Sequence, residues 1–320
     1  MPITLAQAQA LSQDKLTTYV MDEFRKSPLM DALVWDNTVK PQGGRSLTYV
    51  YNRVTTLPTA ATRALNAEYT AQEAVTTQQA VNLKVFGGRF QIDRVLAADE
   101  QQVIDLVQFQ LAQKTQAARA LFTDMFINGD SGSDATEFDG LDAAIAGSST
   151  EAIPTAAIDL SSAAAVESNW PAFLYELRQL RKKLDGAPTL MLVNADLFAV
   201  IQTIADRATQ FQVTKTDLGA EVVQWGNALI MDVGDKPGTS TPIIGTSTET
   251  ETQGETSLYV ARVGLDGVHG VSPDGTAMVQ TYLPNMAEPG AVKSGEVEMV
   301  AAVALKSSRA AGALRRIKVA

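Results

Sequence analysis

The sequence contains one stretch whose side chains could bind an ion, the loop NGDSGSDATEFDGL at residues 128–141. It places acidic side chains and three glycines directly after a long segment that lacks Gly and Pro. Carboxylates at this density could ligate calcium, and a glycine-rich loop could hold a phosphate group on its backbone amides. The same composition is also typical of a structural turn that ends one element and starts another.

The two ion-binding interpretations fit the spacing poorly. An EF-hand pattern counted from Asn128 or Asp130 is broken at an early ligand position. Neither of the glycine-rich phosphate motifs, G-x-x-x-x-G-K-S/T and G-x-G-x-x-G, occurs, and an acidic loop repels phosphate. The sequence therefore favours a structural turn, in which Asn128 and Gly129 end the preceding helix because both tolerate left-handed backbone geometry. A looser calcium site would require four carboxylates to converge: Asp130, Asp134, Glu137 and Asp139.

Other groups that could carry catalysis are scarce. The absence of Cys excludes disulfides, thiolate metal sites and Cys nucleophiles. The only histidine is His269, which excludes a His-pair metal site, and its setting in DGVHGVS indicates a turn or strand end. The serine motif G-x-S-x-G is absent, and the carboxylate pairs at 22–23 and 99–100 are interpreted as solvated helix faces. We therefore expect no catalytic, cofactor-binding or metal-binding residues.

The charge balance argues against a function in reading nucleic acid. The chain has 320 residues, with 26 Lys plus Arg against 36 Asp plus Glu, so its formal net charge is −10. Binding naked nucleic acid through its phosphates needs a basic surface. Five basic residues near the C-terminus are instead expected at strand edges, where they would meet acidic surfaces of neighbouring subunits. They are Lys306, Arg309, Arg315, Arg316 and Lys318.

The sequence also argues against a membrane location. The longest apolar run, MVAAVAL from Met299, is far shorter than the roughly twenty residues that cross a bilayer. The first residues lack the basic and apolar regions of a signal peptide. We expect a soluble, cytosolic product.

The first half of the chain predicts a projecting element. The alternation in SLTYVYNRV, which begins at Ser46, is typical of a strand, and a second strand is expected from Ala80 to Ile92. The 25 residues between these strands, 55–79, are poor in large apolar side chains, and loops of this length are uncommon inside compact domains. We therefore predict a long hairpin that projects from the body and packs on another molecule.

A long helix is predicted to follow the hairpin, from Asp99 to Ile127. Its apolar face, with Val103, Leu106, Val107 and Phe122, is expected to pack on strands near the C-terminus. Beyond the loop at 128–141, alternating helical and strand patterns predict an α/β or α+β region, and two further strands end the chain.

This order of elements resembles the major capsid protein of tailed double-stranded DNA bacteriophages with the HK97-type fold. The local matches are NGDSGSDATEFDGL, SPLMDAL and FGGRFQIDR. The resemblance implies a mixed α+β fold with five consecutive parts. These are an N-terminal arm at 1–45, an E-loop with flanking strands at 46–92, a P domain with a long spine helix at 93–150, an A domain at 151–285, and return strands of the P domain at 286–320.

The resemblance implies a structural protein of the virion rather than an enzyme. Its copies would assemble in the host cytoplasm as hexamers and pentamers into an icosahedral shell, which encloses DNA without sequence-specific binding and without a membrane. Separate scaffolding, portal and decoration proteins are further partners that the resemblance allows. The alternatives are an encapsulin-type compartment holding cargo enzymes and, from another class, a soluble enzyme with an unrecognised site.

The hairpin is the hypothesised contact between subunits. Residues 46–80 contain no lysine, the nearest being Lys40 and Lys84, so the covalent Lys–Asn crosslink of some family members is not expected. Only about 45 residues precede the hairpin, so a built-in scaffolding extension is not expected either. The hypothesised contact residues are Leu57, Arg63, Leu65, Glu68, Tyr69, Glu73 and Val75.

Overall fold

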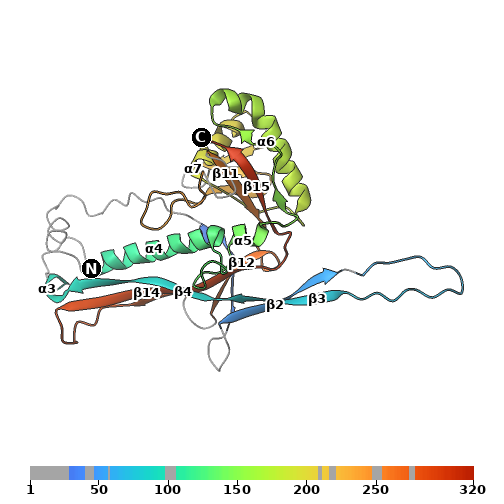
Figure 1. Ribbon diagram of the computed structural model, residues 1–320. Coiled ribbons are helices and arrows are strands. Elements are labelled where there is room, and N and C mark those ends of the chain that lie inside the picture. The colour runs from blue at the N-terminus through green and yellow to red at the C-terminus, as the bar shows by residue number, and fades with distance from the viewer. Residues whose placement is uncertain are drawn as a thin grey trace.

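The computed structural model describes most of the chain as two β-sheets, a long helix lying along one of them, and a hairpin projecting from the body (Figure 1). The described residues are 29–39, 47–56, 58–97, 106–207, 211–215, 221–246, 254–273 and 278–320.

The first sheet has five strands drawn from distant parts of the sequence. Its central strand is β14 (Val292–Leu305), which lies between β12 (Val268–Pro273) and β13 (Val279–Tyr282). The strand β1 (Trp35–Val39) pairs with β12, and β4 (Lys84–Asp93) runs antiparallel to β14 over its whole length. Residues near the N-terminus are thus joined to the C-terminal third of the chain.

The long helix α4 (Leu106–Asn128) packs on β4 and β14. Phe122 is fully buried in one cluster with Met299 of β14, while Leu106 packs on Ile92 of β4. The expected packing on a C-terminal strand is therefore found, with β4 as an additional partner. The predicted start of this helix and Val103 lie outside the described residues. Two short helices, α2 (Leu29–Ala32) and α3 (Arg94–Ala97), precede α4.

The second sheet has eight strands and is covered by two helices. Its order is β5 (Glu151–Ala152), β15 (Ala311–Lys318), β11 (Glu255–Ala261), β7 (Leu190–Val193), β10 (Ala228–Asp232), β9 (Glu221–Trp225) and β8 (Phe211–Lys215), with β6 (Ile158–Asp159) also paired to β15. The helices are α6 (Ala163–Lys183) and α7 (Ala195–Ala205).

Local sequence explains where the two covering helices begin. The side chains of Ser162 and Asn194 accept hydrogen bonds from backbone amides in the first turns of α6 and α7. Leu177 and Ile201 are among the inward-facing side chains that pack with Met191 of β7. The helix, strand and helix formed by α6, β7 and α7 agree with the alternating helical and strand patterns that the sequence predicts beyond the loop at 128–141.

The two C-terminal strands lie in different sheets. The sequence interpretation placed all of residues 286–320 in the P domain, yet β14 belongs to the five-stranded sheet and β15 to the eight-stranded sheet. The strand β12 lies in the range expected for the A domain, but it pairs with β14 in the five-stranded sheet. The reason is that strand partners are chosen by packing between distant segments, which follow no order along the chain.

The predicted hairpin is present and extends away from the sheets (Figure 1). Its strands are β2 (Thr48–Thr56) and β3 (Val75–Asn82), and the segment from 58 to 74 forms no further strand. The single strand expected from Ala80 to Ile92 is in fact two strands, β3 and β4, separated at the buried Leu83.

The loop after α4 is a tight structural turn that leads into the short helix α5 (Leu141–Ile145). The amide of Gly129 donates to the carbonyl of Met125, and the amide of Gly140 donates to the carbonyl of Gly129. A Cβ on Gly129 would lie 2.3 Å from the carbonyl oxygen of Phe138. Neither Asn128 nor Gly129 has a positive φ, so the expected reason for this glycine was wrong. It is required by the close approach of backbone rather than by left-handed geometry.

Candidate functional site: the hairpin and its anchor

The hypothesised contact residues lie on the exposed outer part of the hairpin. Leu65 is 94 % exposed, Tyr69 is 61 % exposed and Val75 is 52 % exposed. Arg63, Glu68 and Glu73 are exposed as well, whereas Leu57 lies outside the described residues. Apolar side chains in such positions gain nothing in the isolated chain and become favourable only when another surface covers them.

The hairpin tip is ordered by its own contacts. The guanidinium of Arg63 lies 5.4 Å from the ring centroid of Tyr69 and donates to the carbonyls of Ala64 and Ala67. Further back, the amide of Thr59 donates to the side chain of Gln72 across the hairpin. The exposed residues are therefore presented on a braced element.

The base of the hairpin is anchored to the end of β14. The hydroxyl of Tyr51 donates to the carbonyl of Leu305 over 2.8 Å. The Arg53 guanidinium donates to the carbonyls of both Leu305, at 2.5 Å, and Lys306, at 2.9 Å. Tyr51 and Arg53 are two positions apart on β2, so both project from the same face of the strand, toward β14.

A buried cluster completes the anchor. Tyr49 donates to the carboxylate of Asp36 over 2.9 Å, and the ammonium of Lys306 lies 5.5 Å from its ring centroid. The ring of His269 meets the Tyr49 ring at 78° with a centroid distance of 5.7 Å. Burial, assisted by the hydrogen bond to Asp36, raises the pKa of Tyr49 above its ordinary value. Tyr49 is therefore a hydrogen-bond donor throughout the physiological range.

His269, expected at a turn or strand end, is the second residue of β12 and is fully buried. Neither ring nitrogen has a hydrogen-bond partner among the described residues. Burial, and after it the positive charge of Lys306, lowers the pKa of His269 below its ordinary value. The imidazole is accordingly neutral at pH 7.

The sequence interpretation missed the anchor residues. The alternation in SLTYVYNRV puts Tyr49 and Tyr51 on one face of a strand, but Leu305 and His269, which meet that face, lie more than 200 positions away. Alternation identifies a face and carries no information on what covers it.

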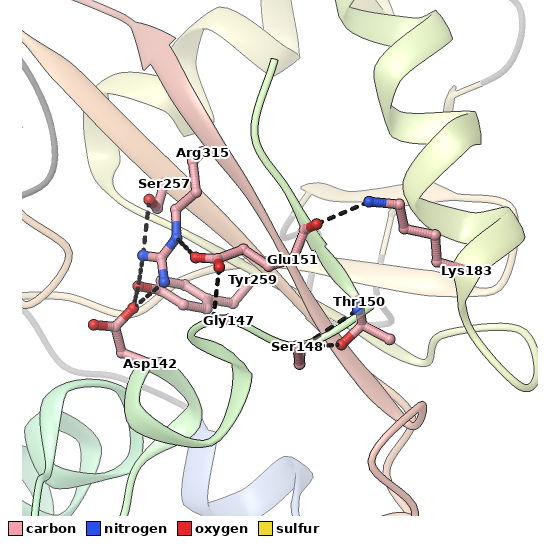
Figure 2. A network of polar contacts seen from close by, with 9 residues as sticks. All are labelled: Asp142, Gly147, Ser148, Thr150, Glu151, Lys183, Ser257, Tyr259 and Arg315. Carbon is pink, nitrogen blue, oxygen red and sulfur yellow. Dashed lines mark hydrogen bonds and ion pairs between the residues drawn. The ribbon is translucent and has the colours of Figure 1, made fainter. Parts of the chain in front are cut away.

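A second polar cluster joins the region around α5 to the eight-stranded sheet (Figure 2). Its centre is Arg315 on β15, which pairs with Asp142 of α5 at 2.5 Å and with Glu151 of β5 at 3.0 Å. Tyr259 of β11 accepts a hydrogen bond from Arg315 and donates one to Asp142. This cluster ties three elements to one buried guanidinium and fixes how α5 sits against the sheet.

Arg315 corrects one expectation from the sequence. The C-terminal basic residues were predicted at strand edges facing neighbouring subunits, but Arg315 is only 7 % exposed and is paired within the chain. Arg316 likewise donates to the carbonyls of Pro154 and Thr155 and lies 3.6 Å from Glu255. Both are used for internal bonds because β15 is an interior strand with neighbours on either side.

The carboxylates of the acidic loop accept hydrogen bonds from the loop's own backbone amides. Asp130 accepts from the amide of Gly132, and Asp134 accepts from that of Thr136. These bonds, with those from the hydroxyls of Ser133 and Thr136, lower the pKa of both carboxyl groups. Glu137 and Asp139 accept from the amides of Asp130 and Ser131. Within the described residues no three His, Asp or Glu side chains are grouped so that they could hold a metal ion.

A groove of about 760 Å³ runs between α4 and the loop at 233–239. Its α4 wall is mostly Gln, Ala and Thr, and its charged rim includes Lys236, which pairs with Asp124 at 3.5 Å. Such a wall has none of the glycine-rich backbone or grouped carboxylates that hold phosphates or cations. No helix in the described part of the chain is both long and apolar enough to cross a membrane.

Several solved structures share this architecture, and each match covers almost the entire chain. A chain of the holo-SrpI encapsulin complex from Synechococcus elongatus PCC 7942 matches with a TM-score of 0.65 and 14 % identity, covering 99 % of this chain and 97 % of that one. A chain from the capsid of Myoviridae phage XM1 matches with a TM-score of 0.57 and 11 % identity, covering 98 % and 99 %. A chain from Mycobacterium phage Bobi matches with a TM-score of 0.61 and 12 % identity, covering 98 % and 99 %. No family model and no curated protein sequence matches the chain.

The expected fold is thereby confirmed. The chain has the mixed α+β, HK97-like fold over nearly its full length. The structural matches establish the fold. Because the sequence identities are so low, they do not establish the function, which has to be argued from the surface of the molecule.

Proposed function

We propose that the chain is the major capsid protein of a tailed bacteriophage, whose copies assemble as hexamers and pentamers into an icosahedral shell around double-stranded DNA. The observation that carries the proposal is the hairpin, which is anchored at its base and exposes Leu65, Tyr69 and Val75 at its outer end. A side chain of this kind contributes roughly 1.5–3 kcal/mol when fully buried, so contact with a second copy is strongly favourable.

The hairpin also suits assembly because of where it lies. It extends away from both sheets, so its outer part cannot fold back on the core that anchors it (Figure 1). An element of one copy that inserts against the next copy makes a head-to-tail contact, and such contacts form rings when the rotation between copies closes. Hexamers and pentamers are rings of this type.

Charge supports an enclosing role. The formal net charge of −10 disfavours adhesion of packed DNA to the protein, which leaves the polymer free to be packed and released. The proposal therefore assigns the chain a structural role without catalysis, in the virion, and allows separate scaffolding, portal and decoration proteins.

A second candidate is an encapsulin-type compartment that holds cargo enzymes. The observation that favours it is the TM-score of 0.65 to the encapsulin chain, against 0.61 for the phage Bobi chain. Both candidates predict closed shells and differ in what the shells contain.

The test is electron cryo-microscopy of the purified full-length protein, followed by assay of nuclease-resistant nucleic acid in particles purified from their native source. The capsid proposal predicts closed icosahedral particles that contain double-stranded DNA. Closed particles that carry protein cargo and no DNA would favour the compartment. A small oligomer by size-exclusion chromatography at all concentrations would contradict both and favour a soluble enzyme.

A further inference from the structure

The anchor of the hairpin contains a buried group that can change charge near neutral pH. His269 is fully buried, and it contacts the ring of Tyr49, one of the residues through which β2 reaches the five-stranded sheet. It is also the only histidine in the sequence. Tyr51 and Arg53 also bind the end of β14, so release of β2 requires their hydrogen bonds to open as well.

We propose that His269 makes the hairpin base sensitive to acid: protonation of its imidazole breaks the contact with Tyr49 and releases β2 from the five-stranded sheet. This inference concerns the single chain, so it stands or falls independently of whether the chain forms shells.

Three groups near His269 favour an imidazolium, but each also has another partner. Before β12, Asp266 is ion-paired with Arg262 at 2.6 Å, and the carbonyl of Gly267 accepts from the amide of Lys306. From β1, Asp36 accepts the hydroxyl proton of Tyr49. Burial and Lys306 outweigh the attraction of these groups, so the pKa of His269 is lowered.

The remaining neighbours oppose a second positive charge. Lys306, just after β14, places its ammonium over the Tyr49 ring, and Arg53 of β2 donates to the carbonyl of Lys306. A cation at His269 would be buried beside the charge of Lys306, without water to screen it. Opening the hairpin base would hydrate the imidazolium and let water screen it from Lys306, which stays close because β12 and β14 remain paired.

The direction of the pH effect follows from the lowered pKa of His269, caused first by burial and then by Lys306. The opened state binds a proton at the ordinary histidine pKa, whereas the closed state binds it only at lower pH. The closed base is therefore stable above the ordinary value and loses stability as the pH falls below it. Between about pH 7.5 and about pH 5.5 the opening equilibrium should rise, by at most about tenfold.

Hydrogen exchange of the unassembled full-length chain tests the inference. After correction for intrinsic exchange rates, the β2 peptide should lose protection, by up to about tenfold, over this pH range, while β7 in the other sheet should not. In His269→Gln, which cannot titrate, β2 protection should not change over this range. An equal pH response in wild type and His269→Gln would overturn the inference.

Two further measurements keep the inference testable if His269→Gln fails to fold. The imidazole resonances of wild-type protein report a single residue, and they should titrate below the ordinary histidine range, together with the loss of β2 protection. In Lys306→Met the titration should move to higher pH, because one opposing charge is gone. An imidazole that titrates in the ordinary range while β2 stays protected would show that protonation does not release the hairpin.

Discussion

The hydroxyl of Tyr51 donates a 2.8 Å hydrogen bond to the main-chain carbonyl of Leu305, a residue 254 positions later in the sequence. The bond joins the first strand of the hairpin to the end of the strand that runs through the five-stranded sheet. The direction in which the hairpin projects is therefore set by the C-terminal part of the chain.

Replacing Arg53 should loosen the hairpin at its base. Arg53→Met removes two hydrogen bonds from a charged donor to the carbonyls of Leu305 and Lys306. Because Arg53 is only partly buried, we expect a loss of about 1–2 kcal/mol in the local opening free energy, seen as roughly tenfold faster hydrogen exchange in β2. Arg63→Met at the exposed tip is the matched control and should leave β2 unchanged; an equal effect would contradict the assigned anchor.

Shortening the hairpin should separate folding from assembly. Deleting residues 57–75 removes Leu65, Tyr69 and Val75, the first residue of β3, and leaves the five-stranded sheet, the eight-stranded sheet and α4 intact. We expect helix content close to that of the wild type by circular dichroism and no closed shells by electron microscopy. Regular particles of normal stability formed by this variant would exclude the hairpin as an essential contact between subunits.

A methyl group on Gly129 should be poorly tolerated. Its Cβ would lie 2.3 Å from the carbonyl oxygen of Phe138 and 2.5 Å from that of Met125. Since backbone atoms cannot move away cheaply, Gly129→Ala should cost about 1–3 kcal/mol or more in the free energy of unfolding, measured by urea denaturation. Gly132→Ala meets only the side chain of Asp130 at 3.1 Å and should cost much less. Equal costs would show that the turn can relax.

Removing the Arg315 side chain should destabilise the junction around α5. Arg315→Met leaves Glu151, which is 13 % exposed, without its ion-pair partner. We expect the free energy of unfolding to fall by about 2–4 kcal/mol. The loss is smaller than for a fully buried pair because Asp142 is partly exposed to solvent. Arg309→Met, on the exposed turn before β15, should change stability by less than about 1 kcal/mol. A loss of similar size for both variants would argue against a special role of the buried cluster.

Covalent crosslinks through the hairpin should be absent from assembled particles. No lysine lies between residues 46 and 80, and the ammonium of Lys84 donates to the carbonyl of Ala135 instead. Particles boiled in denaturant should therefore migrate as a single band near 34.1 kDa. A ladder of larger bands that resists boiling and reductant would contradict this expectation.

Local patterns in the sequence predicted most elements of the structure. The alternation around Tyr49 and Tyr51 identified β2, and the shortage of large apolar residues in 55–79 identified a projecting hairpin. The stripe that contains Phe122 identified the long helix. These features depend on side-chain periodicity and turn chemistry, which act between residues close in sequence.

Only the tertiary structure decided which of these elements lie together. The sequence interpretation kept the two C-terminal strands in one unit and placed Arg315 at an exposed edge. It placed His269 near a strand end, where it lies, without indicating what covers it. In the fold β14 and β15 belong to different sheets, Arg315 is enclosed by α5 and β11, and His269 is buried against the ring of Tyr49. Each of these outcomes depends on contacts between residues far apart in the chain. Such contacts are selected by the free energy of packing the whole core, and no local pattern encodes them.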